Sequence, residues 1–195
     1  MSQISTLAEI VATRERLRSE AIARLGLEKL REWMRSEDME VLGCVYHTIG
    51  DRRYDSRIEP ALSADERDLF LKRYFTRCFR EDPKGQWCNS RYSAGWDLVG
   101  WLTALWKESK ADPKSQSFLA GWKEWLRTLY LEGDEPLREC LTNATLEHLF
   151  ETGGIAKYFS DWKDEVPLSE AYVRAMDWSK RGGRSPLGGS RRSAG

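Results

Sequence analysis

Apolar residues spaced for one face of a helix recur along the chain, and this spacing most constrains its fold. Ser63 and Glu66 form a capping box, in which each side chain binds an otherwise free backbone amide. Behind it, one apolar stripe contains Leu71, Phe75, Cys78 and Phe79. A helix is therefore predicted from Ser63 to about Asp82, where the following proline disfavours helical backbone.

The same spacing predicts three further long helices. They begin near Asn89 or Ser90, near Ser115 and at Asp134, and the last ends at the Gly153-Gly154 pair. Their apolar stripes contain Leu98, Trp101, Leu102 and Leu105; Phe118, Trp122, Trp125 and Leu129; and Leu137, Leu141, Ala144 and His148. Shorter helices are predicted over 155–162 and 168–178, and two more over 4–24 and 27–35.

Residues 39–49 fit either a strand or a helix. Their valines suit a strand, whereas Met39, Leu42 and Tyr46 have the spacing of a helix capped by Ser36. An isolated strand is not stable, and the sequence offers no second convincing strand to pair with it. We therefore predict a helix here, followed by a charged loop over 50–60.

The predicted fold class is all-α, an irregular multi-helix bundle or a short stack of helical hairpins with about seven to nine helices. The length of 195 residues suits one helical domain over 1–180. Residues 181–195 are different, with five glycines, three serines, four arginines and no acidic residue. Because such a segment buries too little surface to fold alone, we predict a disordered basic tail.

The expected compartment is the cytoplasm. No apolar run approaches the roughly 18 residues that a membrane span needs, and the N-terminal residues lack the pattern of a secretory signal. We therefore expect no membrane partner. In such a compartment cysteines are normally reduced, so free thiols are predicted at Cys44, Cys78, Cys88 and Cys140.

The motifs of common enzyme classes do not occur in the sequence. There is no glycine-rich phosphate loop and no Gly-x-Ser-x-Gly nucleophile turn. Only two histidines are present, which restricts general-base chemistry, and His148 lies on an apolar stripe as a core or edge residue. We predict a non-enzymatic protein without a cofactor; the alternative is an enzyme whose site combines acids and arginines from several helices.

A zinc site is the one metal centre that the sequence suggests. Cys44 and His47, joined by Cys78 and Cys88, would supply four ligands of the right type. Zinc sites usually use two closely spaced pairs, however, and Cys78 belongs to an apolar stripe. We predict no metal site and leave a weak one at Cys44 and His47 open.

Nine tryptophans are present, and they can fill a core or form an interface. Residues 86–97 combine aromatic side chains with arginine, as interface anchors do. The predicted protein-binding residues are Trp87, Arg91, Tyr92, Trp96 and Asp97. In the alternative interpretation, both tryptophans pack under the loop and Arg91 pairs with Asp97.

The sequence favours a helical protein-binding module, an adaptor or a neutralising or accessory subunit of a larger bacterial-type assembly. Its formal net charge of zero argues against a general nucleic-acid binder. The alternative is a nucleic-acid-associated accessory subunit whose basic tail contacts phosphates. The candidate contact residues in that tail are Arg181, Arg184, Arg191 and Arg192. The oligomeric state stays open.

Overall fold

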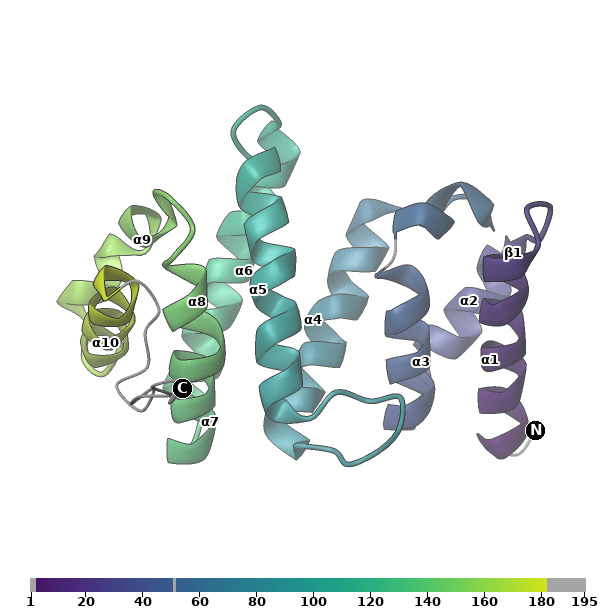
Figure 1. Ribbon diagram of the computed structural model, residues 1–195, viewed down its shortest axis with the longest axis horizontal. Helices are drawn as coiled ribbons and strands as arrows, with labels where there is room; N and C mark the ends of the chain where they lie inside the picture. The colour runs from purple at the N-terminus through teal and green to yellow at the C-terminus, as the bar shows by residue number, and fades with distance from the viewer. Residues whose placement is uncertain (1–2, 51, 182–195) are drawn as a thin grey trace, which may run out of the picture. The chain divides into compact units, whose positions relative to one another are not determined.

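The computed structural model describes residues 3–50 and 52–181, with side chains described from residue 6 onward. These residues are helical almost throughout and confirm the all-α fold class (Figure 1). The two strands among them have only two residues each. Apart from Arg181, the predicted basic tail lies outside the described residues.

The chain divides into two compact units, Met1–Ala94 and Gly95–Gly195. The single domain expected over 1–180 stays a prediction. The first unit contains α1 (Gln3–Ser19), β1 (Leu25–Gly26), α2 (Leu27–Met34), α3 (Met39–Ile49), the 3-10 helix η1 (Arg52–Arg57), β2 (Ile58–Glu59) and α4 (Ala64–Glu81). Helix α5 (Arg91–Glu108) begins at the end of this unit and continues into the second.

Helix α3 forms the centre of the first unit. It contacts α1, α2 and α4, and Figure 1 shows it between α1 and α4. The predicted helix over 39–49 is thus confirmed, and most of its side chains are buried. Its N-cap is Asp38, whose carboxylate accepts the Glu40 and Val41 N–H groups; the predicted cap, Ser36, instead accepts the N–H of Asp38.

Two other predictions for this unit are wrong. Helix α1 ends at Ser19, five residues before the expected end. The segment over 50–60 is not a plain charged loop, because it contains η1 and then β2. Strand β2 pairs in parallel with β1, Leu25 opposite Ile58 and Gly26 opposite Glu59. This pairing partner could not be recognised in the sequence, since a two-residue strand has no periodicity.

The caps of α4 agree with the prediction. Ser63 and Glu66 form the capping box in full. At the other end, Asp82 is the C-cap with a left-handed backbone conformation (φ 44°), and its carboxylate accepts the N–H of Arg91 at 2.8 Å. Helix α5 then starts directly after Ser90, one of its two predicted starting points.

Arginine side chains bind carbonyl groups in the C-terminal turns of helices, where the regular intrahelical hydrogen bonds end. Five helices share this arrangement. The pairs are Arg57 with Leu17 in α1, Arg67 with Ile49 in α3, Arg73 with Met34 in α2, Arg91 with Phe79 in α4, and Arg138 with Tyr130 in α6 (Pro113–Glu132). Each guanidinium group therefore joins two segments of the same unit.

The loop between α4 and α5 is bound to α3 by a single carboxylate. Glu40 accepts the backbone N–H groups of Gln86, Trp87 and Cys88, each at 3.1 Å. The loop also packs directly on the helix, because a Cβ atom at Gly43 would lie 2.3 Å from the Trp87 carbonyl oxygen. These contacts fix the loop that holds Trp87.

The second unit contains α6 (Pro113–Glu132), α7 (Glu135–Cys140), the π-helical segment η2 (Leu141–Leu146), α8 (Glu147–Leu149), α9 (Ile155–Tyr158), the 3-10 helix η3 (Ser160–Asp164) and α10 (Leu168–Lys180). The helix predicted from Asp134 thus runs through α7, η2 and α8, with Asp134 as its N-cap. Helix α6 starts earlier than expected because Asp112, not Ser115, caps it.

Tryptophan contributes strongly to both cores. Trp33 in the first unit, and Trp122 and Trp162 in the second, are among the largest fully buried side chains. The prediction that tryptophans fill the core is therefore confirmed for these three residues. Among the described helices, none is long and apolar enough to cross a membrane.

Replacing Glu40 by Gln is expected to destabilise the protein by about 1–3 kcal/mol at neutral pH, because it weakens three hydrogen bonds to one charged acceptor. Burial opposes ionisation of Glu40, but hydrogen bonds from Cys88, Trp87 and Gln86 outweigh it and lower its pKa. A lowered pKa stabilises the folded chain above about pH 4.3, and this stability is lost as the pH falls through the folded-state pKa.

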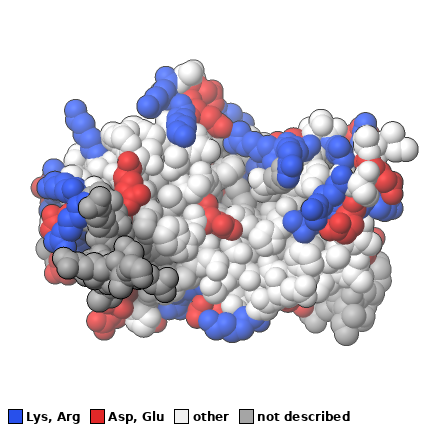
Figure 2. Space-filling model, in the orientation of Figure 1, with Lys and Arg blue, Asp and Glu red and all other residues white. Residues whose placement is uncertain are grey.

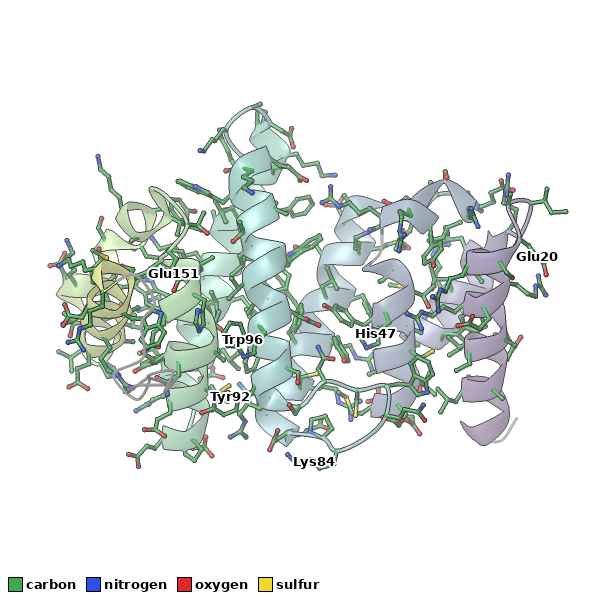
Figure 3. The ribbon with its side chains drawn as sticks, in the orientation of Figure 1. Glu20, His47, Lys84, Tyr92, Trp96 and Glu151 are labelled. Atoms are coloured by element: carbon green, nitrogen blue, oxygen red, sulfur yellow. The ribbon has the colours of Figure 1, made fainter. Side chains whose placement is uncertain are left out.

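Urea unfolding of wild type and Glu40→Gln from neutral to acidic pH tests this account. We expect the difference in unfolding free energy to shrink below about pH 4. Glu20→Gln, at an exposed position (Figure 3), serves as the control and is expected to change little. Equal stability of wild type and Glu40→Gln at neutral pH would contradict the anchoring role of this carboxylate.

Candidate binding surface

Two of the predicted interface residues have structural partners in the first unit. Trp87 is half-buried, with the guanidinium carbon of Arg14 at 5.5 Å from its ring centroid. Arg91 donates from Nε to the Phe79 carbonyl at 2.7 Å and so caps α4. Their role in partner binding stays a prediction, but both contribute to the structure of the unit itself.

Tyr92 and Trp96 are the exposed aromatic residues of the predicted interface. Their exposed fractions are 50 % and 53 %, and Asp97 is exposed as well. Tyr92 and Trp96 are four residues apart on α5 (Figure 3), so they lie on the same face of that helix. An exposed tryptophan in a chain that buries others completely requires a local explanation.

Trp96 belongs to a row of three rings from three helices of the second unit. Its ring centroid lies 4.0 Å from that of His148 in α8, and the two planes differ by 32°. On its other side, His148 meets Trp178 of α10 edge to face at 5.7 Å. We call these three residues the aromatic row. Glu151 accepts the Trp178 indole N–H at 2.9 Å, and its Oε1 lies 3.5 Å from Nδ1 of His148.

A close contact between α5 and η2 places Trp96 in this row. A Cβ atom at Gly95 would lie 2.7 Å from the Cβ atom of Ala144, so only glycine allows the present approach. The Gly95 carbonyl also accepts a hydrogen bond from Thr145 Oγ1 at 3.4 Å. Because Gly95 faces this contact, the side chain of the next residue, Trp96, lies at the edge of the contact between α5 and η2.

The π-helical segment brings His148 to the same edge. A π turn adds one residue to a helical turn, and such turns are frequent at functional sites. The stripe that begins with Leu137 and Leu141 therefore continues to Leu149, which is fully buried, one residue later than α-helical spacing predicts. His148 is displaced from the stripe and lies half-buried between two tryptophans. Its predicted position on the apolar stripe is therefore wrong, whereas the prediction of an edge residue is correct.

Acidic and basic residues both lie beside the aromatic row, in a unit with a net negative charge. Residues 95–180 contain ten basic and fifteen acidic residues, a net charge of −5. A pocket beside Trp178 is lined by Glu147, Arg174, Asp177 and Arg181. Burial raises the pKa of Glu147. The side chain of Arg174 donates a hydrogen bond to Asn143 Oδ1 at 2.9 Å.

The four candidate nucleic-acid contacts are only partly described. Arg181 follows α10 and lines the pocket beside Trp178. Arg184, Arg191 and Arg192 lie outside the described residues. A phosphate-binding role for these arginines stays a prediction.

The four cysteines are free and buried. Burial raises the pKa of Cys44 to about 11 and that of Cys78 and Cys88 to about 12, so these thiols stay protonated at neutral pH. Within the described ranges, no three His, Cys, Asp or Glu side chains are grouped so that they could hold a metal ion.

Comparison of the chain with models of known protein families, with curated proteins and with solved structures finds no match in any of the three. The function therefore has to be inferred from the residues and geometry above. That the protein has no enzymatic activity stays a prediction.

Two glycines of α5 test the close contact. Gly95→Ala is expected to destabilise the protein by about 1–3 kcal/mol, because the new methyl group overlaps Ala144. Gly100→Ala is the matched control: a Cβ atom there meets nothing within 4 Å, so the higher helix propensity of alanine should stabilise by about 0.5–1 kcal/mol. Urea unfolding measures both; stabilisation by Gly95→Ala would contradict the contact.

Arg91→Ala tests the capping role. Loss of the guanidinium leaves the Phe79 carbonyl without this partner, and we expect the unfolding free energy to fall by about 1–2 kcal/mol. Arg16→Ala, an exposed arginine on α1, is the control and should change stability by less than about 0.5 kcal/mol. If thermal unfolding shows both variants to be equally stable, Arg91 is available for a partner instead.

Proposed function

We propose that the protein is a protein-binding module, an adaptor or accessory subunit that docks a partner protein through the aromatic row of its second unit. One observation carries this proposal: Trp96 is 53 % exposed and yet its ring packs closely against that of His148, with centroids 4.0 Å apart. The proposal keeps the predicted residue Trp96 and adds His148 and Trp178, all of the second unit, whereas a binding role for Tyr92 of the first unit stays a prediction.

The fixed orientation of the rings favours tight binding. Trp96 packs against the tilted ring of His148, and Trp178 is bound to Glu151 through its indole N–H. Side chains that are ordered before binding lose little conformational entropy when a partner arrives. Tryptophan is also the residue type most enriched among the few residues that dominate the energy of an interface.

The charges around the row indicate what kind of partner segment it binds. Figure 2 shows that the visible face of the second unit is largely uncharged around α5 and α8, with isolated acidic side chains. Glu147 of α8, Glu151 in the turn after α8 and Asp177 of α10 lie next to the row, as do Arg174 and Arg181. Complementary charge steers association and fixes register, so the expected partner segment combines apolar side chains with lysine or arginine.

The direct test is capture of the partner with the tagged full-length chain, with nuclease present, from the cells that make it. Wild type is expected to retain a protein at a ratio near one to one. Trp96→Ala should weaken this complex by at least about tenfold, the typical cost of losing a central aromatic anchor. The matched control is Val166→Ser, which changes another exposed apolar residue of the same unit (80 % exposed).

The controls separate the alternatives. Circular dichroism should show that Trp96→Ala keeps the helical fold, because its side chain is half exposed. A partner that binds Trp96→Ala and wild type equally would contradict the proposal. A parallel capture without nuclease is the comparison: a protein that is retained there but lost when nuclease is present would favour the nucleic-acid-associated function.

A further inference from the structure

A groove between α2 and α4 in the first unit is separate from the aromatic row. Its floor is apolar and is formed by Met34, Leu69 and Phe70. Leu69 is 71 % exposed, so its side chain is accessible to a ligand in the groove. Arg31, Arg35, Arg73 and Glu66 form the rim.

Two bridges between the helices keep the groove open. On one side, Arg31 of α2 donates from Nε to Glu66 of α4 at 2.7 Å. On the other, Arg73 of α4 donates to the carbonyl groups of Met34 and Ser36, each at 2.8 Å. Because these bonds fix the end of α2 against α4, the groove exists before any ligand binds.

Arg35 is the rim arginine that offers its positive charge to a ligand. Hydrogen bonds from Arg31 and then Ser63 lower the pKa of Glu66 to about 2, so this carboxylate is ionised but already bound. Arg31 and Arg73 also have further carboxylate partners, Glu28 and Glu37. The side chain of Arg35 is exposed and has no hydrogen bond or ion pair with any described residue.

We propose that this groove binds an acidic amphipathic segment of a second protein, with an apolar side chain on Leu69 and Met34 and a carboxylate on Arg35. The apolar side chains of Met34 and Leu69 favour a ligand that carries an apolar side chain beside its acidic group, as a peptide does and a bare phosphate does not. A carboxylate and a guanidinium group form paired, charge-assisted hydrogen bonds. An amphipathic helix in a groove is a common mode of peptide recognition.

This groove gives the adaptor a second binding site with the opposite charge preference. The aromatic row lies in a unit whose residues 95–180 carry a net charge of −5, and we expect it to select basic segments. The groove would select acidic ones. The two proposals are independent, because each rests on residues of a different unit.

A displayed library of random peptides of about 16 residues, selected against the full-length protein, tests the groove. We expect one enriched class with Leu, Phe or Met flanked by Asp or Glu. Synthetic peptides of that class should bind Leu69→Ser and Arg35→Glu at least about tenfold more weakly than wild type, a loss of about 1.4 kcal/mol each. Fluorescence anisotropy measures this affinity.

Matched controls change the same residue types elsewhere in the first unit. Ile22→Ser replaces another exposed aliphatic residue, 85 % exposed, and Arg16→Glu reverses the charge of an exposed arginine on α1. Both should bind the peptides within about twofold of wild type. The affinity should also fall as salt rises from about 0.1 to 0.5 M, since the carboxylate pair is exposed.

Three outcomes would overturn the proposal. One is an enriched class without acidic residues, and the second is equal binding to wild type and to both groove variants. The third is self-association of the wild-type chain that Leu69→Ser abolishes in sedimentation equilibrium, which would make a second copy the occupant. Failure of the Trp96→Ala experiment would leave this result unaffected, because that variant changes only the aromatic row.

Discussion

Guanidinium groups bound to the C-terminal carbonyls of helices connect most of this structure. Carbonyl groups at the end of a helix need partners, and burying them without one costs free energy. The donors are Arg57, Arg67, Arg73, Arg91 and Arg138, each from another segment of the same unit. An arginine used in this way is less available to a ligand. The side chain of Arg35 binds no carbonyl group among the described residues, and the proposed groove depends on it.

The same reasoning separates the predicted interface into a structural part and an exposed part. Arg91 caps α4, and Glu40 holds the backbone of Trp87. One turn later, the contact of Gly95 with Ala144 leaves Trp96 exposed but packed against the ring of His148. Exposure and rigidity together distinguish the aromatic row from the buried tryptophans, and they are the physical basis of the proposed function.

Local patterns in the sequence predict most of the helices correctly. The capping box at Ser63, the N-cap at Asp134 and the helix over 39–49 all depend on residues within a few positions of each other. The π-helical segment has no such signal, and its extra residue replaces His148 by Leu149 in the buried stripe. Long-range contacts are equally hidden: Arg73 reaches a carbonyl group 39 residues earlier in the chain. Only the contacts of the folded chain show which arginines and tryptophans are exposed.

The central claim is that Trp96 lies inside a protein interface, and site-specific photo-crosslinking tests it most directly. A photoreactive phenylalanine analogue replaces Trp96 in the full-length chain in one sample and exposed Val166 in another. Irradiation in the cells that make the protein should link one protein partner to position 96 and leave position 166 without a specific adduct. The absence of any adduct at position 96, or the same set of adducts at both positions, would contradict the account.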